Sequence, residues 1–300
     1  MAVFSRVLSI FILMVVGYAA RKAKAIDHTL VRGLSGLILN VSIPFTIIAS
    51  FDRSIPRSAL PDLARVGLWT IAILGASILL AKLIYRRFPE DKRKVLSYVT
   101  VFSNCGFMGF PVIESAFGKI GVMYGSIYVI IFQTLVWTYG VSIYQGAAER
   151  GQLKKALLNM GNIAVLAGLG IWLLPFDLPG AVQTSIVTLS QLTTPLSMIV
   201  VGATLAEVPV RGLLSGAELW IGTAMRIVVI PAAVYGVMRV FGVVDLPAKI
   251  AAFLTAMPAA AQSVIFAERY GANTALASRT VFVSTVLSVV TLPVFAVLFA

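Results

Sequence analysis

Two clusters of glycine, proline and amide residues interrupt apolar segments of this 300-residue chain. The first reads SNCGFMGFP (103–111), and the second reads TAMPAAAQS (255–263). Glycine weakens a helix, and proline removes a hydrogen-bond donor and clashes with the carbonyl four residues back. We therefore predict that both segments break inside a membrane. Each break would leave backbone N–H groups and a positive helix end, and two such ends together would bind an anion.

The candidate binding residues are those of the two breaks that could offer an N–H group, an amide or space for a ligand. They are Asn104, Cys105, Gly106, Gly109, Pro111, Met257, Pro258, Ala259 and Gln262. Asn104 and Gln262 would add neutral side-chain donors beside the helix ends. A plain proline kink without a binding role is the alternative for each segment.

Charged residues within apolar segments are costly and mark further candidates. Arg226 could face a substrate carboxylate, pair with Glu268 or bond the carbonyls of a broken helix. Glu114 and Glu268 lie near the ends of their segments, where they could be hydrated or could carry a coupled proton. A polar set could line a cavity or bond across helices. Its members are Asn40, Ser42, Pro44, Gln191, Thr194 and Pro195.

The segments that must position these residues belong to a membrane. The chain is 59% hydrophobic and 12% charged, whereas a soluble domain has about 25% charged residues. Its apolar runs lack strand-like alternation and are about 20 residues long, which is typical of membrane-spanning helices. We predict ten spans, over 3–20, 30–51, 63–85, 95–117, 119–145, 157–175, 182–206, 215–240, 247–270 and 274–299.

The distribution of charge predicts the orientation. Of the 24 Lys and Arg residues, 16 lie in odd-numbered loops, so these loops should be cytoplasmic and both termini extracytoplasmic. The basic residues lie between apolar runs, which argues against a nucleic-acid partner. With one histidine, one cysteine and no aspartate inside a predicted span, we expect no metal, no cofactor and no enzymatic activity.

The longest polar interruption near the middle divides the chain into halves of five spans. We place the first half at 1–145, a cytoplasmic connecting loop at 146–156 and the second half at 157–300. Because five is an odd number, two homologous halves would insert with opposite orientations.

Weak internal similarity supports such a repeat. Aligning Pro44 with Pro195, at a shift of 151, also aligns three pairs of polar residues. These pairs are Asn40 with Gln191, Ser42 with Thr193, and Thr46 with Ser197. Glu114 aligns with Glu268 at a shift of 154. We predict an inverted repeat, in which paired broken helices indicate a transporter's binding site.

The sequence resembles the auxin efflux carrier family, the PIN-like transporters, over essentially its whole length. The motifs that carry the resemblance are LSGLILNVSIPF, SNCGFMGFPVIESAFG, MRIVVIP and TAMPAAAQSVIFAERYG. The resemblance implies that the fourth and ninth spans cross at their breaks, with Asn104, Pro111 and Pro258 at the crossing. It also implies a scaffold of helices 1, 2, 6 and 7, a homodimer through helices 2 and 7, and elevator-like movement of helices 3–5 and 8–10.

The family exports organic anions, including the carboxylate auxin. The plant carriers have a long cytoplasmic loop, which this chain replaces with the short segment 146–155, so other mono- and dicarboxylates are equally open as substrates. The leading hypothesis is a secondary transporter that exports a small organic anion through the cell (inner) membrane. The alternatives are an anion channel and a membrane sensor that does not transport.

Overall fold

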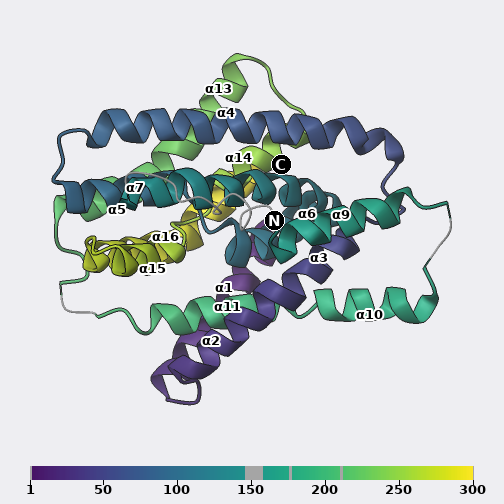
Figure 1. Ribbon diagram of the computed structural model, residues 1–300, viewed down its shortest axis with the longest axis horizontal. Helices are drawn as coiled ribbons and strands as arrows, with labels where there is room; N and C mark the ends of the chain where they lie inside the picture. The colour runs from purple at the N-terminus through teal and green to yellow at the C-terminus, as the bar shows by residue number, and fades with distance from the viewer. Residues whose placement is uncertain (1, 146–157, 176–177, 210–211, 300) are drawn as a thin grey trace.

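Figure 1 shows a computed structural model of the chain, which describes residues 2–145, 158–175, 178–209 and 212–299. Within these ranges the chain is helical, and its one β-type contact is an isolated bridge between two loop segments. The predicted connecting loop at 146–156 lies outside the described residues.

The first half contains eleven named helical segments. They are α1 (Ala2–Lys22), α2 (His28–Leu37), η1 (Ile38–Ser42), α3 (Ile43–Ser50), η2 (Arg57–Ala59), α4 (Leu60–Tyr85), α5 (Glu90–Val101), η3 (Cys105–Gly109), α6 (Phe110–Leu135), η4 (Val136–Gly140) and α7 (Val141–Gln145). The described part of the second half continues the series. Its segments are α9 (Met160–Leu173), α10 (Gly180–Ser190), α11 (Thr193–Leu205), α12 (Ala217–Ala224), η5 (Met225–Val229), α13 (Ile230–Val240), α14 (Leu246–Thr255), α15 (Gln262–Arg269) and α16 (Thr274–Phe299).

Six continuous helical stretches within the described ranges are long and apolar enough to cross a membrane. They are His28–Ser50, Arg57–Tyr85, Cys105–Gln145, Gly180–Leu205, Ala217–Val240 and Thr274–Phe299. The number is below the ten predicted spans partly because several spans are interrupted or short. Helices α5, α9 and α14 have only 12, 14 and 10 residues. The stretch Cys105–Gln145 counts once although Gly118, at φ 66°, divides α6 into two helices.

Proline explains three π-helical turns in the described chain. The turns η1, η3 and η5 each end two residues before a proline, at Pro44, Pro111 and Pro231 respectively. Proline cannot donate to the carbonyl of the preceding turn, and its ring crowds that carbonyl. A wider turn relieves the crowding, so the hydrogen-bond register shifts before each proline. The fourth π-helical turn, η4, has no proline after it.

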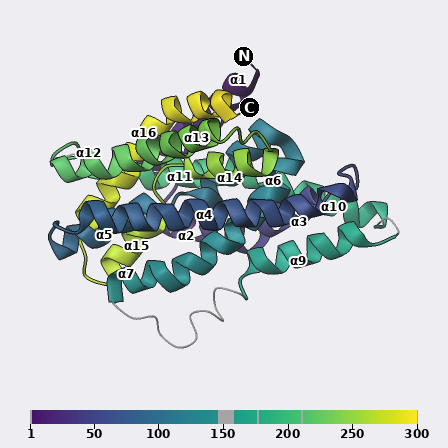
Figure 2. The same cartoon turned by 90° about the horizontal axis from the view of Figure 1, so that it is seen from above.

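Helices α1 and α11 cross in direct contact, and two glycines there face the opposite backbone. A Cβ atom added to Gly17 would lie 2.1 Å from the carbonyl oxygen of Ile199, and one added to Gly202 would lie 1.9 Å from that of Met14. Small residues allow this direct contact between helix backbones. Helix α3 packs against α9, and α4 packs against α5, α6 and α14 (Figure 1 and Figure 2).

Polar contacts between distant loops fall into two sets within the described chain. One set joins the loops that follow the second, fourth and sixth predicted spans. Its contacts are Asp52 with Lys119, and Arg53 and Arg57 with the carbonyl of Leu174. The other set joins odd-numbered loops and the helix ends beside them. Its contacts are Arg21 with Glu207, Lys92 with Glu218, Asn273 with Asp91, and Arg279 with the carbonyl of Gly212. Loops of like parity share a face when successive spans alternate in direction.

Candidate functional site

The first predicted break begins where α5 ends. Helix α5 stops at Val101, the backbone is extended at Phe102, and η3 begins at Cys105. Pro111 lies outside this extended stretch, as the second residue of α6. Proline fits the first turn of a helix because the N–H groups there have no partner within the helix. The interruption therefore precedes Pro111 by several residues.

The second predicted break separates α14 from α15. Helix α14 ends at Thr255, and α15 begins at Gln262. Pro258 lies inside this non-helical stretch, and Met257, Pro258 and Ala259 are all buried. In contrast to the first break, the proline here is part of the interruption itself.

The two non-helical stretches meet in an isolated antiparallel bridge between Ser103 and Ala259. The N–H of Asn104 donates to the carbonyl of Pro258 at 2.8 Å, and the N–H of Ala260 donates to the carbonyl of Phe102 at 3.1 Å. The Ser103 hydroxyl donates to the carbonyl of Leu254 at 3.0 Å. These bonds join the ends of four helical segments at one place inside the protein.

Arg226 bonds the carbonyl ends of both interrupted helices. Its guanidinium donates to the carbonyl of Thr100 at 2.7 Å and that of Val101 at 3.2 Å, in the last turn of α5, and also to the carbonyl of Thr255 at the end of α14. The side chain is 1% exposed. A cation at a helix C-terminus offsets the negative end of the helix dipole. Of the three roles open for Arg226, the structure shows bonding to helix carbonyls, and no described carboxylate forms an ion pair with it.

The pairing uses N–H groups that we expected to be open. Those of Asn104 and Ala260 bond across the two breaks, and that of Ala259 bonds the hydroxyl of Ser284 on α16 at 3.1 Å. The N-terminal turns that follow the breaks begin at Cys105 and at Gln262. The first N–H groups of a helix have no partner within the helix, but those of Ser263 and Val264 donate to the carbonyls of Ala260 and Ala261 at 3.0 and 3.1 Å. The donors left to a ligand are therefore the first N–H groups of η3 and that of Gln262.

The glycines of the first break have different surroundings. A Cβ atom on Gly109 would lie 3.0 Å from Cδ2 of Leu254, so Gly109 lets η3 approach α14 closely. A Cβ atom on Gly106 would meet nothing within 4 Å. Gly106 and Gln262 are half-buried, whereas Asn104 and Cys105 are buried. The space beside η3 therefore lies at Gly106.

The polar set of the second and seventh spans divides into a buried and an exposed group. The hydroxyls of Ser42 and Thr193 bond each other, and the hydroxyl of Thr46 lies 2.6 Å from that of Thr193. Pro44 is buried, Thr194 and Pro195 are half-buried, and Asn40 and Gln191 are exposed. The side chain of Asn40 donates to the carbonyl of Gly36 at 2.9 Å, within its own helix.

Glu114 and Glu268 lie apart from the carbonyls that Arg226 binds. Glu114 is exposed on α6, four residues before the bend at Gly118, and Glu268 is exposed near the end of α15. No ion pair joins Arg226 to either of them within the described ranges. No described cluster of three or more His, Cys, Asp or Glu residues could hold a metal ion.

Sequence reasoning did not single out Ser103 and Ser284 as functional, although both hold the breaks in place. Ser284 lies on α16, whose other buried hydroxyl residues include Thr280, Thr285 and Ser288. Buried polar residues are unusual within an apolar span, because they need hydrogen-bond partners. The cluster of hydroxyl residues within this apolar span could have indicated Ser284 from the sequence.

Comparison with known families decides what kind of protein carries these paired breaks. A family described as membrane transport protein matches residues 2–296. The chain belongs to this family, the PIN-like auxin efflux carriers. The family assignment and the apolar helices together make the chain a multi-pass membrane protein of a transporter family.

Relatives with assigned names are similar over nearly their whole length. An "Uncharacterized transporter" of Methanothermobacter thermautotrophicus is 27% identical, and the match covers 97% of this chain and 96% of the relative. A Rhizobium meliloti protein named "Putative malonate transporter" is 23% identical, over 95% of this chain and 92% of its own length. An uncharacterized transporter of Methanocaldococcus jannaschii is also 23% identical.

Proposed function

We propose that this chain is a secondary transporter that carries a small organic anion, a mono- or dicarboxylate, across the cell membrane. The main observation that supports this proposal is the hydrogen-bonded pair of breaks, in which Arg226 donates to the carbonyl ends of α5 and α14. The membership in a transporter family and the malonate-related name of one relative support the same reading.

The electrostatics of the paired breaks favour an anion. Arg226 offsets the negative C-terminal ends of α5 and α14. The positive N-terminal ends at the breaks are those of η3 and α15. Helix N-termini bind anions through their free N–H groups and the helix dipole. We place the substrate carboxylate at the first turns of η3 and α15, with the amides of Asn104 and Gln262 as additional donors. Gly106 leaves room for it. The backbone around it is shaped by Cys105, Gly109, Pro111, Met257, Pro258 and Ala259.

The proposed architecture is two inverted five-helix repeats, over 1–145 and 157–300, with crossing fourth and ninth helices. Equivalent positions of two repeats can touch only near the axis that relates them. Ser42 bonds Thr193, its partner at the shift of 151, and Asn104 bonds Pro258, its partner at the shift of 154. The contacts of α1 with α11 and of α9 with α3 are likewise exchanged by such an axis.

The proposed mechanism is an elevator in which helices 3–5 and 8–10 move against a scaffold of helices 1, 2, 6 and 7. The scaffold would form a homodimer through helices 2 and 7. Helix α10, the first part of span seven, has no buried residue. Large apolar side chains of α2 and α10 are also exposed, among them Leu30, Leu37, Val182 and Val187. A second copy of the chain would cover this surface.

The proposed direction is export from the cytoplasm, with both termini extracytoplasmic. A negative-inside membrane favours the exit of each negative charge by about 2.3 kcal/mol per 100 mV. Uniport is therefore sufficient, and proton coupling through Glu114 or Glu268 is not required.

The test is malonate flux in proteoliposomes under an imposed potential, with wild-type protein, Asn104→Ala and the control Gln183→Ala. Gln183 is an exposed amide on α10. We expect saturable flux for wild type and control, and a loss of about tenfold or more for Asn104→Ala, because a donor to a charged group is removed. Unchanged flux and affinity in Asn104→Ala would exclude this placement of the substrate. Single-channel currents would indicate a channel instead, and carboxylate binding without flux would indicate a sensor.

A further inference from the structure

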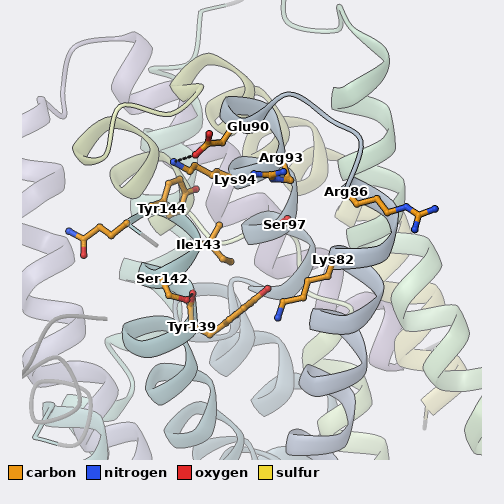
Figure 3. Close-up of a pocket in the computed structure, with 12 residues that line it drawn as sticks. Lys82, Arg86, Glu90, Arg93, Lys94, Ser97, Tyr139, Ser142, Ile143 and Tyr144 are labelled. Atoms are coloured by element: carbon orange, nitrogen blue, oxygen red, sulfur yellow. Dashed lines mark hydrogen bonds and ion pairs between the residues drawn. The ribbon is translucent and has the colours of Figure 1, made fainter. Parts of the chain in front are cut away.

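A basic cavity lies away from the paired breaks, between the end of α4, the start of α5 and the segment formed by η4 and α7 (Figure 3). Its volume is about 590 Å³. The lining residues are Ala81, Lys82, Arg86, Glu90, Arg93, Lys94, Ser97, Tyr139, Ser142, Ile143, Tyr144 and Gln145. All of them lie between the third and fifth predicted spans, so the cavity belongs to one half of the chain.

The cavity carries an excess of positive charge. The lining contains four cations and one carboxylate, that of Glu90, and the Nζ atom of Lys94 lies 2.8 Å from it. The cations are Lys82, Arg86, Arg93 and Lys94. No described carboxylate forms an ion pair with the remaining three cations. These three would attract an anion to the opening of the cavity.

The cavity wall also contains an unpaired polar group. Tyr144 is 4% exposed, and its hydroxyl has no hydrogen-bond partner among the described residues. A buried hydroxyl without a partner is costly. Lys82 places its ammonium 5.5 Å from the centre of the Tyr139 ring, on the neighbouring wall. A ligand in the cavity would therefore meet the ammonium of Lys82, with the Tyr144 hydroxyl buried within the wall.

The outer surface of α4 connects this cavity to lipid. Leu68, Ile71, Leu79 and Leu83 are large apolar side chains with 58–69% of their surface exposed. In a membrane protein such side chains contact acyl chains. Leu79, Leu83 and Arg86 recur at the spacing of one helix face, and Figure 3 shows Arg86 extending away from the other lining residues. The apolar stripe thus ends in basic residues at the cavity.

We propose that this cavity binds the phosphate headgroup of an anionic phospholipid, whose acyl chains lie along the exposed face of α4. Lys82 and Arg93 would bind the phosphate from the cavity, and Arg86 would bind it from the lipid side. Basic pockets between helices on the cytoplasmic side of membranes bind anionic headgroups. The cavity lies at the same end of the helices as the ion pair of Lys92 with Glu218, because Lys92 neighbours the lining residue Arg93. The charge distribution predicts that this side of the protein is cytoplasmic. The proposal does not depend on the nature of the transported substrate.

The experiment measures dioleoyl phosphatidylglycerol bound to the purified full chain by native mass spectrometry, with dioleoyl phosphatidylcholine as the neutral reference lipid. The test variant is Lys82→Gln with Arg93→Gln. The matched control is Lys24→Gln with Arg87→Gln, which removes the same charge from odd-numbered loops without altering a lining residue. We expect the test variant to lose affinity for phosphatidylglycerol by about twenty-fivefold, which is about fivefold for each of the two cations. The control should bind as wild type does.

Three results would overturn the proposal. They are equal losses in the test and control variants, equal binding of the two lipids, and displacement of phosphatidylglycerol by inorganic phosphate or succinate at low concentration. The last would identify a site for small soluble anions. If the double variant does not give a monodisperse protein, Arg86→Gln is compared with Arg87→Gln. A selective loss in Arg86→Gln supports the lipid site, and equal binding contradicts it.

Discussion

The backbone N–H of Asn104 donates to the carbonyl of Pro258 at 2.8 Å, although 154 residues separate them. The same shift aligns Glu114 with Glu268 in the sequence. Under the proposed inverted repeat, Asn104 and Pro258 are therefore equivalent positions that meet at the axis. A substrate bound beside this pair would be near the centre of both halves, where movement of either half changes its surroundings.

Arg226 should be required for stability as well as for transport. Replacing it with methionine leaves the carbonyls of Thr100, Val101 and Thr255 without their guanidinium donor. We expect the free energy of unfolding to fall by about 3 kcal/mol, because buried carbonyls lose a charged partner. The stability of Arg226→Lys should lie between those of wild type and Arg226→Met, since an ammonium group cannot bond several carbonyls in the way that the planar guanidinium does.

Thermal unfolding in detergent measures the effect of Arg226, with Arg239→Met as the control. Arg239 is exposed near the end of α13, the helix that follows η5. The role assigned to Arg226 is wrong if Arg226→Met unfolds at the wild-type temperature.

Gly109 and Gly106 should respond differently to alanine. A methyl group on Gly109 would press on Leu254 of α14, and we expect a loss of about 1–2 kcal/mol in stability together with slower flux. A methyl group on Gly106 enters open space, so the fold should tolerate it. Substrate affinity of Gly106→Ala should nevertheless fall, because the methyl group occupies the space proposed for the anion. Binding titrations and unfolding of both variants distinguish packing from ligand contact, and equal behaviour of the two would contradict this assignment.

The crossing of α1 and α11 should not accept a side chain at Gly17. The added methyl group would overlap the backbone of Ile199, which cannot move without shifting α11. We expect Gly17→Ala to destabilise the protein by about 3 kcal/mol or to abolish folding. Gly170→Ala is the control, since nothing lies within 4 Å of the added atom. Alanine should stabilise that helix by about 0.5–1 kcal/mol. Similar melting temperatures for the two variants would show that α1 and α11 are not in such close contact.

The pair of Asp52 and Lys119 should make stability depend on pH in the acidic range. The side chain of Lys119 and the N–H of Ser54 donate to Asp52 and lower the pKa of its carboxyl from 3.8 to about 2. Because the folded-state pKa is the lower one, the contribution is present above pH 4 and is lost as the pH falls toward 2. It should be at most about 1 kcal/mol, since Lys119 is exposed.

Unfolding of wild type, Asp52→Asn and Lys119→Gln between pH 7 and pH 3 tests this pair. Both variants should be less stable than wild type at pH 7, and the differences should shrink with acidification. Differences that stay constant over this range would show that the carboxyl of Asp52 is not responsible.

Local chemistry accounts for much of what the sequence predicted. The apolar runs indicate helices because a backbone in lipid must satisfy its own hydrogen bonds. Helices end at Val101, two residues before the first cluster, and at Thr255, the first residue of the second cluster. The position of Pro111 differs, since proline lies comfortably in the first turn of α6 rather than in the interruption. The π-helical turns before Pro44 and Pro231 were not predicted, because the sequence shows a missing donor but not how the neighbouring turn adapts.

By itself the sequence determined that the chain is helical, that it belongs in a membrane and where two helices are interrupted, since each depends on residues close together in the chain. Only the tertiary structure showed that the two interruptions bond each other and that Arg226 bonds the carbonyl ends of α5 and α14. Those bonds join residues up to 154 positions apart. Such contacts depend on the packing of whole helices, which no local pattern specifies.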